Sequence, residues 1–595
     1  MPEYLSPGVY VEEFESGSRP MEGVSTSTAG FIGLAEKGTV EGLPELVTNA
    51  ADFQRKFGGY LSQNEFGDYR YLAYAVEHFF INGGGRCYVM RVAPSDAKPS
   101  KNFSEDMQDK TVLCISAKNP GIWGDKVRVK LYPSSKAKTQ IYKVMTDPAS
   151  TEVQYLVKNG AGFNPGDVVM FYDGEKGEHE YSTVKGSQDN ILTLAAPLAA
   201  GEGAVDTALL PKKVLTTCEF SMQVAYRDLV ELYENVSLNI GEANFVEKMV
   251  SKSNIITVSV NNQGAESVPP FKVITAKEEF QKAGDSEKID LNSEIIALSG
   301  GSNGSIKSIT AADFMGKDDG PGKRSGIKAF IDNDEVSLMA VPGVTDPDVQ
   351  LFLIAHCESL ASRFAVLDIP REKKTVADVQ THRNIFDSNY AAMYNPWLQV
   401  FDPLEKRNVF IPPSGPVLGI YARVDNSRGV HKAPANEVVR ACSGLDCQYN
   451  KGEQDILNPK GVNLIRYFTG EGIRVWGART CTSNSLWKYI NVRRLFIYLE
   501  ESIKKNTNWV VFEPNDQSLW DRVQRTIENF LTTVWRSGAL MGNAPAEAFF
   551  VKVDRTTMSQ DDIDNGRLIC VIGVAPVKPA EFVIFRITQK TGDQQ

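Results

Sequence analysis

Both ends of the chain carry a short apolar run that prolines separate from the rest of the sequence. The N-terminal run consists of Val9, Tyr10, Val11 and Glu12. It lies between Pro7 and Pro20, and a second run at 582–587 follows Pro576 and Pro579. Proline excludes helix at these places, and a lone strand leaves its backbone N–H and C=O groups unpaired. Each run is therefore expected to join a sheet, either in its own domain or in a neighbouring subunit.

Between these ends the hydrophobic period changes along the chain. Residues 100–215 alternate apolar and polar side chains, which predicts a small all-β part. From 216 onward strand-like runs alternate with helical patterns, such as a helix at 346–363 followed by a strand at 364–367. Strand, helix and strand in this order predict a layered α/β sheet.

The last part of the sequence predicts a small α+β unit. One helix is expected to be capped by Asn491, a second spans 515–536, and strands follow at 549–553 and 568–574. The predicted divisions are an N-terminal arm (1–23), an N-terminal part of the core (24–99), a β-rich insertion (100–215), an α/β domain (216–483), a C-terminal domain (484–580) and a C-terminal arm (581–595).

Composition excludes several classes of protein. The net charge of −10 at pH 7 gives no overall attraction to nucleic acid. No apolar run approaches the roughly 18 residues of a membrane span, and the first residues do not resemble a secretory signal. We therefore expect synthesis and assembly in the cytoplasm, without nucleic acid and without direct membrane insertion. The eight cysteines are scattered, which does not suit a disulfide scaffold.

Three features imitate enzyme or metal sites. Ser302 lies in a G-x-S-x-G pattern, but the loop continues where a nucleophile elbow needs a helix. Lys323 lies in a glycine-rich loop that lacks both ends of a Walker A motif. The five histidines show no zinc-ligand spacing. We expect no catalytic residue, cofactor or metal, and spacing alone leaves open a serine triad assembled in space.

Segments in both ends and the middle carry a further signal. They are YLSPGVYVEE (4–13), NGGGRCYVMRV (82–92), LSGGSNG (298–304), GPGKRSG (320–326), AAMYNPWL (391–398), the run 412–436, NVRRLFIYLEESI (491–503), FEPNDQSLWDRV (512–523) and the run 566–589. As an ordered set they resemble the tail sheath proteins of contractile phage tails and of phage-like contractile injection systems. Residues 100–215 lie outside this resemblance.

The resemblance implies a structural, non-catalytic subunit. Such subunits form hexameric rings that stack helically around an inner tail tube, with baseplate and tail terminator proteins as further partners. Contraction drives the tube through a target envelope. The resemblance also implies a subtilisin-like fold for 216–483, although the catalytic segments of active subtilisins are missing, and a shared fold does not transfer a reaction. A non-contractile surface or adhesin protein and a subtilisin-fold serine hydrolase stay open as alternatives.

Within this resemblance we predict the residues that join subunits. The donated strands are Val9, Tyr10, Val11 and Glu12 at one end and Phe582, Val583, Ile584 and Phe585 at the other. The receiving strands contain Phe549, Val551, Val553, Ile569 and Val571. The tube-facing helix presents Asp521, Arg522, Arg525, Glu528 and Arg536, because weak exposed ion pairs suit a contact that must release. The insertion at 100–215 is expected to face outward as a decoration.

Overall fold

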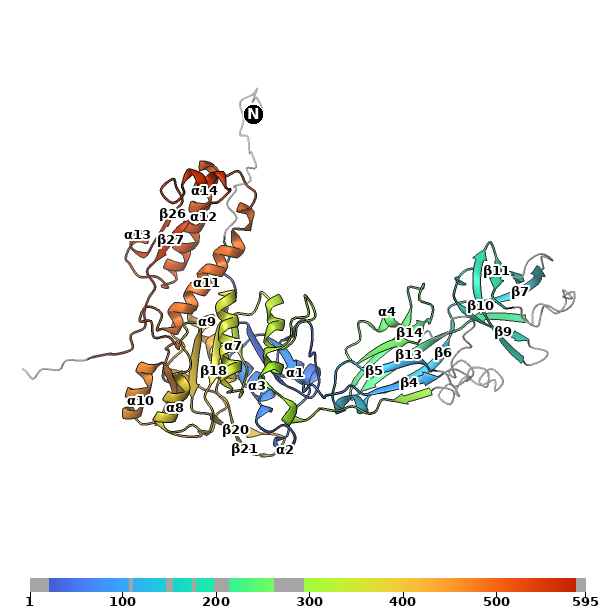
Figure 1. Cartoon of the computed structure of the whole chain (residues 1–595), viewed down its shortest axis with the longest axis horizontal. Coiled ribbons are helices and arrows are strands. Elements are labelled where there is room, and N and C mark those ends of the chain that lie inside the picture. The colour runs from blue at the N-terminus through green and yellow to red at the C-terminus, as the bar shows by residue number, and fades with distance from the viewer. Residues whose placement is uncertain are drawn as a thin grey trace, which may run out of the picture. The chain divides into compact units, whose positions relative to one another are not determined.

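The structure is a computed structural model that describes residues 21–105, 111–145, 153–173, 178–196, 213–261 and 294–584. The chain forms two compact units, and each is described by itself (Figure 1). The first unit contains the described residues up to Val92 and from Thr310 onward. The second unit extends from Ala93 to Ile309.

A nine-stranded sheet forms the centre of the first unit, in the order β2-β3-β1-β17-β18-β19-β24-β25-β22. The strands are β1 (Ala29–Leu34), β2 (Glu45–Val47), β3 (Cys87–Val92), β17 (Leu338–Ala340), β18 (Phe364–Asp368), β19 (Ala391–Asn395), β22 (Glu437–Val438), β24 (Val462–Phe468) and β25 (Gly472–Val475). The strands from β3 to β24 run parallel. Every residue of β1, β18 and β19 is buried, as expected for parallel strands covered on both faces. The expected layered α/β sheet is confirmed in this part of the chain.

Helices pack around this sheet. They are α1 (Ala50–Phe57), α2 (Gln63–Phe66), α3 (Leu72–Ile81), α6 (Ala311–Met315), α7 (Pro347–Leu360), α8 (Val376–Arg383), α9 (Ser414–Arg428) and α10 (Lys451–Leu457). The backbones of α3 and α9 approach closely, since a Cβ atom on Gly419 would lie 2.3 Å from the carbonyl oxygen of Phe79. This contact explains a glycine inside a helix, where glycine costs about 1 kcal/mol relative to alanine. A small sheet of β20 (Leu398–Asp402), β21 (Arg407–Ile411) and β23 (Gly444–Leu445) lies beside them.

The last part of the first unit contains two long helices and a short sheet. Its elements are α11 (Ile490–Asn506), α12 (Gln517–Arg536), α13 (Pro545–Ala548), α14 (Gln560–Asp564), β26 (Phe549–Lys552) and β27 (Val571–Val574). The apolar stripe of α12 is buried, including Trp520, Ile527 and Phe530. The predicted cap is wrong, because Tyr489 is the N-cap of α11 and Asn491 lies inside the helix. The Asn491 side chain instead donates to the carbonyl oxygens of His431 and Val577.

The second unit is built from β-strands. One sheet has the order β14-β13-β6-β16, a second has the order β15-β5-β4, and six strands close a barrel in the order β10-β11-β8-β7-β12-β9. The strands are β4 (Lys101–Glu105), β5 (Thr111–Ala117), β6 (Arg128–Ser134), β7 (Lys138–Met145), β8 (Val153–Val157), β9 (Val168–Asp173), β10 (Glu178–Gln188), β11 (Ile191–Leu194), β12 (Lys213–Thr217), β13 (Glu219–Tyr226), β14 (Leu229–Val236), β15 (Ile256–Val260) and β16 (Glu294–Ala297), and one helix, α4, spans Val246–Val250. Ile141, Tyr155, Phe171 and Leu192 fill the barrel interior.

The second unit extends past the predicted end of the insertion at residue 215. The chain enters the barrel after β6 and returns from it in β13, and these two strands pair antiparallel, with Met222 opposite Leu131. Strand β16 then pairs with the other edge of β6. Residues up to Ile309 therefore belong to this unit and not to the nine-stranded sheet.

A cluster of charges lies where the barrel meets its sheet. The Lys136 ammonium is 2.9 Å from Asp167, 3.2 Å from Glu242 and 3.7 Å from Glu219. Burial acts to lower the pKa of Lys136, but the three carboxylates outweigh it and raise that pKa. The cluster joins the segment between β6 and β7 to the residues that precede β9 and open β13.

Among the helices that the structure describes, none is both long and apolar enough to cross a membrane.

Candidate assembly surfaces

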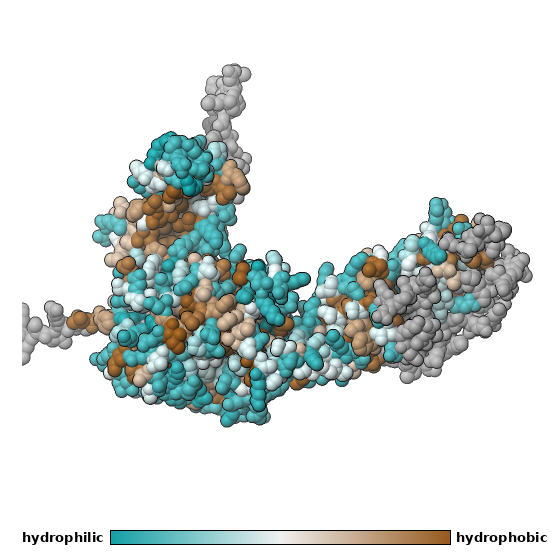
Figure 2. Space-filling model, viewed as in Figure 1, coloured by the Kyte–Doolittle hydropathy of each residue, from teal (hydrophilic) through white to brown (hydrophobic). Residues whose placement is uncertain are grey.

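The predicted receiving strands form a two-stranded sheet at the surface of the first unit. β26 pairs antiparallel with β27, with Phe549 opposite Val574 and Lys552 opposite Val571. Val551 is buried against α12, whereas Phe550 and Val571 are 56% and 43% exposed. Figure 2 shows hydrophobic side chains gathered over this region. The edges of a sheet offer unpaired backbone N–H and C=O groups, so this two-stranded apolar surface suits the addition of further strands.

The remaining predicted receiving residues flank these two strands. Val553 directly follows β26 and is buried. Ile569 precedes β27 and is 37% exposed. Its carbonyl oxygen accepts a hydrogen bond from the Thr557 hydroxyl. The predicted strands 549–553 and 568–574 differ from β26 and β27 by one residue at the end of the first and by three at the start of the second.

Glu581 holds the chain where the predicted C-terminal arm begins. Its carboxylate accepts hydrogen bonds from two guanidinium nitrogens of Arg479 at 2.8 and 2.7 Å, from Asn458 at 2.7 Å and from the Tyr489 hydroxyl at 3.0 Å. Burial acts to raise the pKa of Glu581, but the hydrogen bonds and the charge of Arg479 outweigh it and lower that pKa. Glu581 is therefore an ionised anchor at neutral pH.

The residues directly after Glu581 point away from the unit. Phe582, Val583 and Ile584 are 73%, 68% and 80% exposed and belong to no strand of the structure. Phe585 lies outside the described residues. Three exposed apolar residues in a row, after a fixed residue, are typical of a segment that is completed by another surface.

The N-terminal run of Val9, Tyr10, Val11 and Glu12 lies outside the described residues. The described residues that follow it lie along α11. The Asn506 side chain exchanges two hydrogen bonds with the backbone of Glu22, at 3.4 and 2.9 Å. The Ser502 hydroxyl accepts from the Val24 amide at 3.1 Å, and the Thr26 hydroxyl donates to Asp425 at 2.7 Å.

The predicted tube-facing residues all lie on α12 and differ in their partners. Asp521, Arg525 and Arg536 are exposed, while Arg522 and Glu528 are half-buried. Arg522 pairs with Glu513 at 2.9 Å and lies 4.4 Å from the Trp509 ring centroid. Arg525 donates to the backbone carbonyl of Asp521. Arg522 therefore has a local structural role, and Arg525 and Arg536 are the cations available to a partner.

The features that imitate an active site do not assemble one. The Ser302 hydroxyl accepts a hydrogen bond from the Gly304 amide of its own loop. Arg324 beside Lys323 pairs with Asp318 and Asp332. The Ser414 hydroxyl donates to Asp368 at 2.7 Å, but His382 is hydrogen-bonded to Gln350. Within the described residues, neither Ser302 nor Ser414 forms a hydrogen bond with a histidine. These serines therefore do not belong to a triad of serine, histidine and carboxylate there.

Buried titratable groups support packing in the first unit. Burial lowers the pKa of His78 and His382 to about 4 and that of His356 to about 3. The charge of Lys373 adds to the effect at His382, and that of Arg363 at His356. Burial raises the pKa of Asp368 to about 6 despite the hydrogen bonds from Ser414 and Gly343. Among the described residues no group of histidine, cysteine and carboxylate side chains has the arrangement of a metal site.

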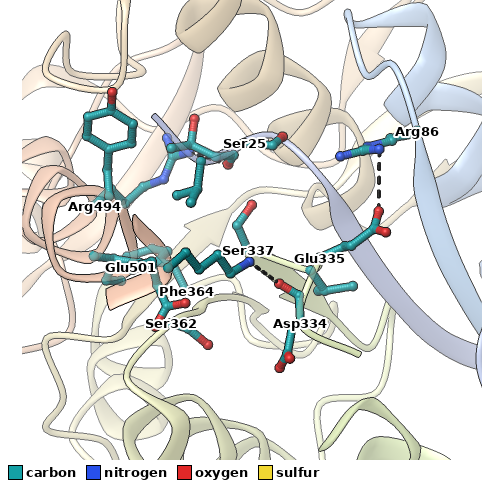
Figure 3. A pocket seen from close by; sticks show the side chains of 15 residues that line it. Ser25, Arg86, Asp334, Glu335, Ser337, Ser362, Phe364, Arg494 and Glu501 are labelled. Atoms are coloured by element: carbon teal, nitrogen blue, oxygen red, sulfur yellow. Dashed lines mark hydrogen bonds and ion pairs between the residues drawn. The ribbon is translucent and has the colours of Figure 1, made fainter. Parts of the chain in front are cut away.

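Two cavities flank the segment that precedes β1. One cavity, of about 160 Å³, is lined by Val24, Ser25 and Thr26 (Figure 3). Its lining also includes charged side chains of both signs, among them Arg86 and Lys505. Arg86 pairs there with Glu335, and Lys505 donates to the Asp334 carbonyl oxygen. A second cavity of about 380 Å³ extends along the same segment toward Phe530 and Val534.

Sequence reasoning missed the anchors at both ends. Arg479 and Glu581 are separated by 102 residues, and Glu22 and Asn506 by 484. No local pattern indicates such a pair, because each becomes a contact only after the chain has folded. The exposed apolar run after Pro579 was the only signal near them.

Comparison with known proteins shows which family the first unit resembles. Residues 309–481 match the family model of the phage tail sheath protein central domain, and residues 482–590 match that of the phage tail sheath C-terminal domain. The tail sheath protein of Escherichia phage P2 is 26% identical over 217 residues, which are 34% of this chain. The chain spans 54% of the length of that relative.

Two solved structures extend the similarity of the fold to nearly the whole chain. One is the sheath complex of the extracellular contractile injection system PVC in its contracted state. It has a TM-score of 0.50 and 20% identity, and the match covers 99% of each chain. The contracted helical sheath of the anti-feeding prophage has the same TM-score and identity, with 99% of this chain and 100% of that chain covered. The family consists of structural proteins, so the expectation that the chain is not an enzyme is confirmed. The chain belongs to the phage tail sheath protein family, which includes the sheaths of contractile injection systems.

Proposed function

We propose that the chain is the subunit of a contractile sheath that polymerises helically around an inner tail tube, and that strand exchange joins its copies. One observation carries the proposal: an incomplete apolar sheet, β26–β27, occurs in the same unit as an exposed apolar run directly after Glu581. The edges of the two-stranded sheet can take a further strand, and the described residues of the run, 582–584, pair with no strand.

Strand addition supplies both adhesion and direction. The C-terminal run Phe582, Val583, Ile584 and Phe585 of one copy adds to the β26–β27 sheet of a neighbour. The N-terminal run Val9, Tyr10, Val11 and Glu12 adds to the β26–β27 sheet of a second neighbouring copy. Main-chain hydrogen bonds give affinity, and alternate side chains set the register. Donor and receiver are different surfaces, so the contact is heterologous and propagates a filament of stacked hexameric rings.

The remaining parts take roles that follow from this assembly. The nine-stranded sheet, for which we propose a subtilisin-like and non-catalytic fold, is a rigid scaffold. Rigid-body rotation of such scaffolds shortens the sheath and drives the tube through a target envelope. The α12 face with Asp521, Arg525 and Arg536 faces the tube. The β-rich part around 100–215 faces outward, and baseplate and tail terminator proteins bound the two ends of the particle, a phage tail or a phage-like injection particle.

Deletion of residues 1–15 tests the strand exchange. The truncated chain should stay folded, with an unchanged melting temperature, and should remain a monomer in light scattering at concentrations where the full chain polymerises. A control substitution at an exposed position of the second unit, Ile240→Ser, should polymerise normally. Normal polymers from the truncated chain would contradict the arm model. A full chain that remains a monomer in the presence of the tube protein would favour the adhesin alternative.

A further inference from the structure

The roots of both proposed arms lie on the same helix, α11. The N-arm root, residues 21–28, contacts the body and the C-terminal end of this helix. The C-arm root, residues 577–581, contacts its N-terminal end, where Asn491 donates to the Val577 carbonyl and Tyr489 donates to Glu581. At about 1.5 Å per residue, the outermost N-arm contact, at Asn506, lies about 20 Å along α11 from the C-arm contact at Asn491.

The contacts with the N-arm root follow one stripe of α11. Asn506, Ser502, Tyr498 and Arg494 are spaced four residues apart and therefore share a helix face. Asn506 contacts Glu22, Ser502 contacts Val24, and Arg494 donates to the Thr26 carbonyl at 3.0 Å. A Cβ atom at Gly23 would lie 2.1 Å from the Tyr498 hydroxyl, so the backbone lies directly on the ring. The root thus runs antiparallel to the helix.

The two halves of the N-arm root are held with different strength. At the inner end Thr26 bonds to Arg494 and Asp425, which form a buried ion pair. At the outer end Glu22 and Val24 make neutral hydrogen bonds with Asn506 and Ser502. A neutral hydrogen bond contributes only about 1 kcal/mol, and the bonds between Glu22 and Asn506 are exposed, so water can replace them.

Packing around the outer half is incomplete. Val24 and Ser25 of the outer half border both cavities, of about 160 and 380 Å³, as does Thr26 at the inner end. Side chains next to a cavity lose dispersion contacts. The outer half is therefore held mainly by its few bonds to α11.

The C-arm root is held by a charged group. Charge-assisted hydrogen bonds to Glu581 come from Arg479, with further bonds from Asn458 and Tyr489. Such bonds are roughly twice as strong as neutral ones. Upstream, the Val577 amide donates to the Ala539 carbonyl, and Leu540 bridges to Pro576. The arm beyond Glu581 therefore starts from a fixed point.

We propose that the N-arm root is a strap whose outer half, residues 22–25, lifts off α11 when neighbouring copies move, while Glu581 fixes the C-arm to the opposite end of the helix. This inference rests on the proposed function, in which both arms join neighbouring copies. Lifting four residues releases on the order of 13 Å of extended chain. The N-arm thus supplies the additional chain length when copies move apart. Glu581 is the positioning residue that keeps the start of the C-arm at a fixed place.

Two matched variants test the asymmetry in the full chain. Asn506→Ala releases the strap, and Glu581→Ala releases the anchor. Hydrogen exchange on unassembled wild-type chain should be at least tenfold faster at 22–25 than at 577–581. Glu581→Ala should accelerate exchange at 577–581 at least fivefold, whereas Asn506→Ala should leave that region unchanged.

The functional readout is the continuity of contracted sheaths in electron micrographs. Asn506→Ala should give continuous sheaths within twofold of wild type, and Glu581→Ala should lower their fraction at least fivefold. Glu581→Gln, which keeps the side-chain size, replaces Glu581→Ala if the latter lowers the melting temperature of the monomer. Equal exchange at the two roots, or equal effects of the two variants on continuity, would overturn the proposal. Failure of the arm model itself is seen separately, as normal assembly without residues 1–15.

Discussion

Arg494 and Asp425 form a buried ion pair between α11 and α9, with Nη2 and Oδ2 2.5 Å apart and side chains 4% and 3% exposed. The Arg494 guanidinium also lies 4.8 Å from the Tyr421 ring centroid and donates to the Thr26 carbonyl oxygen. This pair joins three parts of the first unit: the last helices, the central sheet with its helices, and the N-arm root.

Removing one member of this pair should be strongly destabilising. Arg494→Met leaves the Asp425 carboxylate buried with one hydroxyl partner, which should cost about 3–5 kcal/mol of unfolding free energy. Urea denaturation of the monomer measures the effect. Arg428→Met on the same helix as Asp425 is the matched control, since Arg428 is exposed. A loss below about 1 kcal/mol from Arg494→Met would show that the pair contributes no more than a surface pair.

The first unit should lose stability as the pH falls from 7 toward 4. His78, His356 and His382 have folded pKa values near 4, 3 and 4, below the unfolded value of 6.5. Below about pH 6.5 the unfolded state therefore binds more protons than the folded state, and the free energy of unfolding decreases as the pH falls. Asp368, with its pKa raised from 3.8 to about 6, acts in the opposite direction over the same window.

Three histidines outweigh this one carboxyl group in the balance. Calorimetry should show a melting temperature about 5–10 °C lower at pH 5 than at pH 7. The variant Asp368→Asn should leave this decrease in place, because it removes only the opposing group. A melting temperature that is constant or higher at pH 5 would contradict the assignment of three neutral buried histidines.

Lys136 should be essential for the join between barrel and sheet in the second unit. Lys136→Met leaves Asp167 and Glu219, with side chains 1% and 2% exposed, without their shared cation. The expected loss is about 3–5 kcal/mol, and it should be smaller at pH 5, because burial raises the pKa of Glu219 and favours its protonation. Lys138→Met, at an exposed position two residues later, is the control. Equal stability of the two variants in urea would contradict the role of the cluster.

The exposed cations of α12 should matter for the tube and not for folding. Arg525→Glu with Arg536→Glu should leave the melting temperature within about 1 °C, because exposed charges contribute ~0–1 kcal/mol, and should weaken co-sedimentation with tube protein at least tenfold. Arg555→Glu, also exposed, is the control. Undiminished co-sedimentation of the double variant would show that another face meets the tube. Arg522 is unsuitable for this test because it packs on Trp509.

The sequence predicts elements with strong local signals and fails at contacts between distant segments. The apolar stripe of α12 follows from helical spacing and is present, although the helix begins at Gln517, two residues after the predicted start. Asn491 has the chemistry of a cap, but its side chain bonds to His431 and Val577, which only the fold brings near. The extent of the second unit was hidden for the same reason, because β13 returns to β6 after the barrel.

The candidate site divides in the same way. Residues Phe549, Val551 and Val571 were found because alternating apolar residues indicate strands. Glu581 and Arg479 were not, since an isolated carboxylate after a proline has no pattern of its own.

Electron microscopy of the purified full chain, with and without residues 1–15, is the most direct test of strand exchange between copies. The full chain should form hollow, helically striated tubes, either alone or when tube protein is added, and the truncated chain should form none. Tubes of equal number and length from both chains would contradict the assignment of the N-terminal arm as a donated strand.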